Sequence, residues 1–525
     1  MDTHPITAVA LGSLAHDATL GDFTEDGFLA CERAAQTWLT RFASVHDQDP
    51  DTAVDVELVR CHLRGETAMA AWPAWRRDPA GYVNAPLQAL YGTFLHRMRP
   101  EPELVESAMA RIAELPGVFA ACRANLDQDL AAPLLVRRTL GQLRTARRFL
   151  TVHLPAEVGD ETLRTRLAAA GETASAAADD LADHLEAFAE RATGDWRMGE
   201  ELYSALLTGR ELLGYGAGEL HARGETAYAE LAAEATGLAG DWRAEMARLQ
   251  EDRPATLSEL LAACVRETEQ ARTFLREHDL VSFADGEQCR VVPAPQFLRP
   301  LLAVPFYIAP PRLTASRVGH HFVPFTPEGA SEDLVAQRLR GNSTAQLPSF
   351  AVHEAYPGHH WHLSWMAGNP RAIRKTFTTS YFLEGWALYA ERMMREQGYF
   401  TDPARELAHL DMRLFRAARI VVDTALHCGD MTVAQAEEFM AAKSSLTAAT
   451  ARAEVNRYCA WPTQAPSYLT GALEIERIRT DYLAAGLGDL KSFHDTIAGS
   501  GALPLGLARR VVMRAATPSA GTGSD

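Results

Sequence analysis

Between about residues 20 and 280 the apolar positions recur with the spacing of an α-helix. In the clearest segment, 161–193, apolar residues return every three or four positions within each half: Leu163, Leu167, Leu181, Leu185 and Phe188. This spacing places apolar side chains on one helix face, which packs against other helices. Another amphipathic helix is expected after Pro254, with Thr256 or Ser258 as its N-cap.

The pattern changes near residue 281. Short runs rich in β-branched and aromatic residues, separated by Pro and Gly, predict strands at 289–295, 304–310 and 317–325. Helical spacing returns at Phe350 and continues to about residue 515. The fold class is therefore expected to be mainly α, a large multi-helix fold with a small β layer. The expected parts are an N-terminal helical lobe (1–280), a second lobe with the β layer (281–515) and a disordered tail (516–525).

Charge and composition narrow the classes of function. The chain has 525 residues, with 51 Lys and Arg against 68 Asp and Glu, a formal net charge of −17. Hydrophobic residues make up 47% and charged residues 23%, which is typical of a globular protein that buries a core. Because an acidic chain repels phosphate backbones, we expect no nucleic-acid partner.

The sequence also predicts a cytoplasmic protein. No apolar run approaches the length of a membrane span, and the most apolar stretch, 301–311, contains three prolines, so no membrane partner is expected. No Lys or Arg precedes Arg33, which argues against a signal peptide. The seven cysteines are scattered, without C-x-x-C spacing, as expected for reduced thiols: Cys31, Cys61, Cys122, Cys264, Cys289, Cys428 and Cys459.

One segment, SFAVHEAYPGHHWHLSW at 349–365, carries most of the candidate chemistry. Eighteen histidines occur in the chain, and four of them fall within ten positions here: His353, His359, His360 and His362. Clustering of core or surface histidines by chance is the alternative. The dipeptide His353-Glu354 favours a metal site, because a metallopeptidase needs imidazole ligands and a carboxylate that acts as general base.

The spacing of the second imidazole ligand departs from H-E-x-x-H, because position 357 is Pro. In an unbroken helix His359 would lie about 120° from His353 and His360 only about 20°. That geometry favours His360, but a two-residue bulge at Pro-Gly would bring His359 into place. The spacing alone leaves both open.

A third ligand is expected from another helix. Segment 378–394 is amphipathic and places Glu384 between Leu383 and Trp386, where a buried acid needs a partner. A solvated glutamate or a salt bridge is the alternative. Glu391 lies two turns further along the same helix and is a candidate to orient a ligand by hydrogen bonding.

These blocks resemble a known family. HEAYPGHH, LEGWALYAE and RYCAWPTQAPSYLTG are similar to the bacterial domain of unknown function 885 family, as are GEELYSALL, PPRLTASRVGHHF and ARIVVDTALHCGDMT. The resemblance covers residues 195 to 480, and we expect it to extend to the whole chain. The family's motif arrangement is similar to gluzincin-type zinc metallopeptidases, which implies a deep central cleft between helical lobes, with 281–515 as the metal-binding, catalytic lobe.

The resemblance implies roles for individual residues. His353, His359 and Glu384 correspond to the metal ligands, with zinc as the expected ion. Glu354 corresponds to the general base for a metal-bound water, and His360 to a neighbouring residue or an alternative ligand. The acidic charge balance and the expected absence of a signal peptide favour a cytosolic enzyme that acts on short peptides or amino-acid conjugates.

Further residues are candidates to stabilise the oxyanion or to bind substrate. Tyr458, Gln464 and Tyr468 lie in the block that resembles the family's donor segment. That block departs from the family at Thr463, where Gly is more usual, so the shape of the loop is open. Either tyrosine could instead be a core aromatic.

Arginines and one helix face give weaker candidates. Arg419, Asp423 and His427 recur at intervals of four, which predicts either an ion-pair stripe or part of the substrate pocket. Arg317 could bind a substrate carboxylate or be an ordinary surface residue.

Three functions are therefore considered. The first is a zinc-dependent hydrolase of peptidase type that cleaves an amide bond. The second is a metal-dependent non-peptidase enzyme that acts on a modified amino acid in specialised metabolism. Redox chemistry is one form of it, because two histidines and one carboxylate also suit iron. The third is a helical scaffold that has lost activity, which would predict a missing ligand or base.

Overall fold

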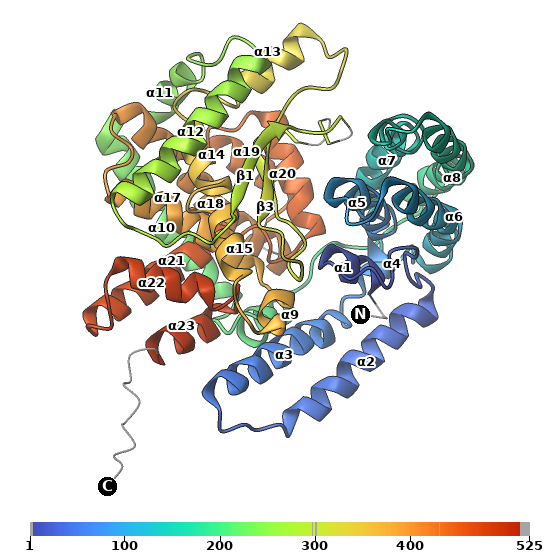
Figure 1. Ribbon diagram of the computed structural model, residues 1–525, viewed down its shortest axis with the longest axis horizontal. Helices are drawn as coiled ribbons and strands as arrows, with labels where there is room; N and C mark the ends of the chain where they lie inside the picture. Colours follow the sequence, from blue (N-terminus) through green and yellow to red (C-terminus); the bar gives the residue numbers. More distant parts are fainter. Residues whose placement is uncertain (1–3, 297, 300–301, 430, 515–525) are drawn as a thin grey trace. The chain divides into compact units, whose positions relative to one another are not determined.

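The computed structural model describes residues 4–296, 298–299, 302–429 and 431–514. It divides into two compact units, each built from more than one stretch of the chain. Unit 1 comprises 1–43, 65–198 and 311–315, and unit 2 comprises 44–64, 199–310 and 316–525. Helices make up most of the described residues, which confirms the mainly α fold class (Figure 1).

Unit 1 is helical throughout its described elements. Its longest helix, α8 (Glu161–Ala189), packs against α6 and α7 and buries the apolar face expected from the sequence. The other elements, including a π-helix (η1) and a 3₁₀-helix (η2), are α1 (Pro5–Ala10), α2 (Glu25–Ala43), α4 (Ala74–Arg77), α5 (Ala80–His96), α6 (Glu101–Asn125), α7 (Pro133–Arg148), η1 (Phe149–His153) and η2 (Pro155–Glu157). Helix α3 (Pro50–Met69) belongs to both units, because the division falls after Arg64.

Unit 2 holds the sheet and the remaining helices. Its first helices are α9 (Glu200–Gly209), α10 (Ala217–Ala239), α11 (Trp242–Leu249) and α12 (Leu257–Glu277). The helices after the sheet are α13 (Glu332–Arg340), α14 (Leu347–Glu354), α15 (His359–Met366), α16 (Ala372–Thr376), α17 (Ser380–Glu396), α18 (Pro403–Cys428), α19 (Val433–Lys443), α20 (Ala448–Ala460), α21 (Ser467–Ala484), α22 (Leu490–Gly499) and α23 (Leu505–Arg514).

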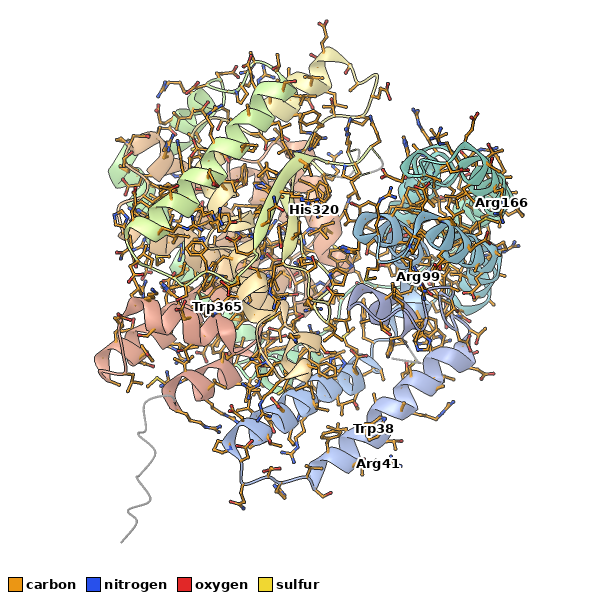
Figure 2. All side chains as sticks on the ribbon, viewed as in Figure 1. Trp38, Arg41, Arg99, Arg166, His320 and Trp365 are labelled. Carbon is orange, nitrogen blue, oxygen red and sulfur yellow. The ribbon has the colours of Figure 1, made fainter. Side chains whose placement is uncertain are left out.

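The expected β layer is a three-stranded sheet in the order β1-β3-β2. Strand β1 (Gln288–Pro293) runs parallel to β3 (Val318–Val323), and β2 (Phe306–Ile308) runs antiparallel to β3. All three lie within the predicted runs or within one residue of them. Figure 2 labels His320, which lies on the central strand β3.

An apolar cluster joins the sheet to the helices that carry the motif. Cys264 of α12, Val323 of β3 and Phe350 of α14 are among its buried members. Helix α12 begins as expected, because the Thr256 side chain accepts a hydrogen bond from the Glu259 amide. This packing fixes α14 between α12 and the rest of unit 2 (Figure 1).

The parts of the chain differ from the expected lobes. The expected boundary at residue 280 falls inside unit 2, because α10 packs against α18 and α12 packs against β1 and α14. Helical spacing alone does not show which helices share a core. The expected tail at 516–525 lies outside the described residues.

Within the described residues, none of the helices has both the length and the apolar character needed to cross a bilayer.

Candidate metal centre

The HEAYPGHH motif is divided between two helices. Helix α14 ends at Glu354 and α15 begins at His359, so the motif does not form one unbroken helix. The Gly358 amide donates to the carbonyl of Val352, and the Trp361 amide donates to that of Ala355. These bonds join residues six positions apart, two more than in an α-helix, so the turn accommodates two extra residues between the helices. The first residue of α15, His359, thereby comes close to His353 near the end of α14.

Gly358 makes this turn possible. A Cβ at this position would lie 1.9 Å from the carbonyl oxygen of His353 and 2.3 Å from that of Val352, far inside contact distance. The turn is held from α17 as well, because the Trp386 indole donates to the Pro357 carbonyl over 2.8 Å. Any larger residue at 358 would separate the two helix ends.

Helix α17 supplies the carboxylate of the group. It approaches α21 closely, since a Cβ on Gly385 would lie 2.5 Å from the Cα of Gly471. The face around Trp386 is buried, while Glu384 keeps a side-chain exposure of 22%. The sequence predicts that an acid at this position needs a partner. The partners of Glu384 are His353 and His359, and not a surface cation.

Three side chains converge: His353, His359 and Glu384. Their ligand atoms all lie within 4.8 Å of one another. Glu384 Oε2 is 3.4 Å from His359 Nε2 and 3.7 Å from His353 Nε2. Ligands of a tetrahedral zinc ion at 2.0–2.1 Å are about 3.3 Å apart. The donor types and their separations therefore fit a zinc ion.

Glu391 orients the first imidazole. Glu391 follows Glu384 by two helical turns on α17. Its Oε1 lies 2.8 Å from His353 Nδ1. This contact places the Nδ1 proton toward Glu391 and leaves Nε2 free for a metal. Behind it, the Nδ1 atom of buried His409 on α18 lies 3.5 Å from Glu391 Oε2.

The group has the electrostatics of a cation site. Burial works against a charged imidazole, but hydrogen bonds with Glu384 and Glu391 and the charge of Glu354 raise the pKa of His353 to about 10. Against the cost of burial, hydrogen bonds from His353 and His359 hold the pKa of Glu384 far below its usual range. Three carboxylates thus share one small volume, where a divalent cation would neutralise them.

Glu354 interacts electrostatically with His353, His359 and Glu384, and it is largely buried. Burial raises its pKa, while the positive charges of His353 and His359 oppose the increase. A raised proton affinity suits a carboxylate that acts as general base.

His360 belongs to a different network. Its Nε2 lies 2.8 Å from Glu287 Oε2 and its Nδ1 lies 3.0 Å from the Tyr307 hydroxyl. Glu287 also accepts hydrogen bonds from Tyr356 (2.6 Å) and Arg272 (2.5 Å). Burial alone would raise the pKa of Glu287, but hydrogen bonds from His360 and Tyr356 outweigh it and lower this pKa to about 2. The structure thus pairs His360 with a buried carboxylate outside the three-residue group.

The two candidate tyrosines differ in position. The Tyr468 ring stacks beside the His353 ring, with 6.4 Å between centroids. Tyr458 instead donates to Glu454 over 2.7 Å and accepts from Arg419. Tyr468 therefore lies next to the candidate ligands, whereas the Tyr458 hydroxyl is part of a separate ion-pair network.

The remaining candidates, Gln464, His427 and Arg317, make hydrogen bonds to nearby protein groups. Gln464 accepts from Arg457 over 2.5 Å and interacts with Tyr468. His427 Nε2 lies 3.0 Å from the carbonyl oxygen of Tyr458, and the Arg317 guanidinium contacts the Ser316 carbonyl.

In the predicted stripe on α18, Arg419 and Asp423 find their partners on other elements. Arg419 pairs with Glu454, and Asp423 accepts from Tyr203 and from the Thr463 amide. Thr463, at the departure from the family pattern, has a φ of +68°, a conformation that glycine adopts without strain.

Three residues near the group were missed by sequence reasoning: Glu287, His409 and Arg416. His409 and Arg416 are seven positions apart on α18, so a search for polar residues at i and i+7 on that helix could have found them. Glu287 gives no such signal, because it lies just before β1, and only the fold brings it to His360.

Solved structures share this fold. A candidate lipoprotein of unknown function from Shewanella oneidensis is similar with a TM-score of 0.78 and 21% identity, covering 97% of each chain. A candidate lipoprotein from Colwellia psychrerythraea is similar with a TM-score of 0.82 and 18% identity, covering 97% of this chain and 95% of that one. At these identities the likeness concerns the fold alone.

The model of a family described as bacterial protein of unknown function (DUF885) matches residues 5–512. The chain therefore belongs to this family. No protein with a curated description matches it.

Proposed function

We propose that this member of the DUF885 family is a metal-dependent hydrolase of peptidase type. It cleaves an amide bond in short peptides or amino-acid conjugates, at a site of gluzincin type. The observation that carries the proposal is the convergence of His353, His359 and Glu384 beside Glu354. The proposal includes the substrate cleft of a gluzincin, which the structure of a complex with a peptide would test.

In this proposal His353, His359 and Glu384 hold the metal, zinc in the first instance. Two imidazoles and a carboxylate are a ligand set of catalytic zinc sites. Such an ion supplies Lewis acidity, which polarises the amide carbonyl and makes water acidic enough to be deprotonated near neutral pH. Side-chain exposures of 14% for His359 and 22% for Glu384 leave a path for substrate.

Glu354 moves the protons. Its carboxylate accepts a proton from the water whose oxygen attacks the amide carbon, and then transfers that proton to the nitrogen of the leaving amine. The carbon–oxygen bond forms, the carbon–nitrogen bond breaks, and no redox partner is needed. Burial helps, because it raises the pKa of the Glu354 carboxyl group and so its affinity for the proton.

Tyr468 is the residue proposed to donate to the oxyanion. Burial and the charge of Glu384 raise the pKa of its hydroxyl, so the hydroxyl stays protonated and able to donate. Tyr458 is a weaker candidate, because its proton is already given to Glu454.

The experiment compares wild type with Glu354→Gln on libraries of short peptides and N-acylated amino acids, read by mass spectrometry. Wild type loaded with zinc should hydrolyse members of the library. The variant should lose about 10²–10⁴-fold in turnover while it binds the same amount of metal. Equal hydrolysis by both proteins would show that Glu354 is not the base, and metal binding without hydrolysis would count against a hydrolase.

A further inference from the structure

One arginine beside the candidate metal centre has no carboxylate partner. Arg416 is 7% exposed, and among the described residues no Asp or Glu oxygen lies within 4 Å of it. Its Nη1 donates to the Met412 carbonyl over 3.2 Å, and its Nε is buried without a hydrogen-bond partner. A buried guanidinium is costly when its charge and its donors are unsatisfied.

The other buried or half-buried arginines of α18 are different. Arg405 lies 3.4 Å from Glu267, Arg413 lies 2.9 Å from Glu476, and Arg419 lies 2.8 Å from Glu454. Each therefore has an internal counter-charge. Arg416 is the exception on a helix that otherwise pairs its buried cations, so a structural ion pair does not explain it.

Helix geometry places Arg416 on the side of α18 that faces the candidate ligands. Arg416 follows His409 by seven positions, which is about 20° around the helix and about 10.5 Å along it. His409 lies 3.5 Å from Glu391, the partner of His353. The same face of α18 thus carries both His409, which lies next to Glu391, and Arg416.

Tyr468 connects the two groups from α21. Its ring centroid lies 5.8 Å from the Arg416 Cζ and 6.4 Å from the His353 ring. The positive charge of Arg416 also acts on Glu354. It lowers the pKa of the Glu354 carboxyl group, which burial raises. The guanidinium is therefore close enough for one small substrate to reach both Arg416 and the metal ligands.

We propose that Arg416 binds a free carboxylate of the substrate, next to the amide bond that is cleaved. This inference rests on the proposed hydrolase function and narrows its substrates to peptides or N-acyl amino acids cleaved at their carboxyl-terminal residue. A guanidinium presents a planar fork that matches a carboxylate with two hydrogen bonds. Glu391 and Glu454 act on Arg416 only through longer-range attraction, and the substrate carboxylate would supply the direct ion pair.

The test uses dipeptides Ala-Xaa as free acids and as carboxyl-terminal amides, with zinc-loaded wild type, Arg416→Met, Arg416→Lys and Arg405→Met. Wild type should prefer the free acids by at least about 30-fold in kcat/KM. Arg416→Met should lose this preference, Arg416→Lys should keep part of it, and Arg405→Met should behave as wild type. Methionine replaces an unpaired cation, so the variant should stay folded.

A binding measurement separates this inference from the proposed function. The same acids and amides are offered to Glu354→Gln, with and without Arg416→Met, and bound ligand is measured by mass spectrometry. Selection of acids that depends on Arg416 supports the inference even if wild type hydrolyses nothing. Hydrolysis or binding of amides and acids alike, or equal losses for both in Arg416→Met, would overturn it and leave the hydrolase proposal standing.

Discussion

His353 Nδ1 lies 2.8 Å from Glu391 Oε1, and this contact leaves His353 Nε2 as the ring nitrogen that faces Glu384. Both glutamates come from α17, two turns apart, so one helix supplies a candidate ligand and the group that orients another. The close approach of Gly385 to Gly471 holds that helix in place.

Loss of Glu391 should weaken metal binding without removing a ligand. We expect Glu391→Ala to lower zinc affinity by about 10- to 100-fold, because the imidazole of His353 would lose its oriented tautomer. Competition with a chromogenic chelator measures this. Glu396→Gln is a matched control on α17, since Glu396 pairs with Arg479 over 2.7 Å. Equal affinities for Glu391→Ala and wild type would contradict the orienting role.

The second imidazole ligand can be identified by metal content. Untagged protein purified without added metal should carry about one zinc ion per chain. His353→Ala, His359→Ala and Glu384→Gln should each lose it, because each removes a donor of the group. His360→Gln should keep it, since His360 pairs with Glu287. Elemental mass spectrometry gives the count.

The opposite pattern, with metal kept in His359→Ala and lost in His360→Gln, would make His360 the ligand. Iron at the same stoichiometry in wild type would favour the redox alternative and oxygen-dependent assays.

Buried His494 should make the protein less stable in mild acid. Its Nδ1 donates to the Leu280 carbonyl over 2.8 Å, its Nε2 accepts from Tyr389 over 2.7 Å, and burial lowers its pKa from 6.5 to about 4. Between these values the unfolded chain binds a proton that the folded chain does not, so the free energy of unfolding falls as pH falls. The loss should approach about 3 kcal/mol near pH 4.

Urea unfolding between pH 4.5 and 7.5 checks this expectation. His494→Asn keeps a donor for the Leu280 carbonyl but does not titrate, so its stability should fall less steeply over the same range. Parallel curves for the two proteins would mean that His494 does not contribute to the pH dependence.

Thr463→Gly should stabilise the protein. Thr463 is β-branched and has a φ of +68°, a region where such residues are strained. Glycine removes the strain and keeps the backbone amide that donates to Asp423 over 3.1 Å. We expect a net gain of about 1 kcal/mol after the entropy cost of glycine in the unfolded chain. Thermal unfolding measures it, and Thr463→Ala should give a smaller gain. A less stable Thr463→Gly would contradict the argument.

Some of the site was accessible from residue patterns. Glu384 was singled out because an acid on the buried side of an amphipathic helix needs a partner, and its partners are His353 and His359. The strand runs were also predicted, as was a cap at Thr256 or Ser258, of which the structure has Thr256, since both depend on short-range backbone chemistry.

Other features depend on contacts between distant segments. Helical angles favoured His360, yet the chain breaks into two helices at a turn that only glycine fits, and His359 joins Glu384 instead. Glu287, His409 and Arg416 reach their places because separate elements pack together, which spacing along one element does not encode.

The sequence by itself determined the element types, the mainly α class, the family resemblance and the kinds of side chain available to bind a metal. Periodicity, capping and local composition are properties of neighbouring residues, so they can be read along the chain. The tertiary structure decided which imidazole faces Glu384, which carboxylate orients His353 and which arginine of α18 makes no direct ion pair with a carboxylate of the described residues. These depend on distances between groups far apart in sequence, and those distances are fixed only when the helices of unit 2 pack.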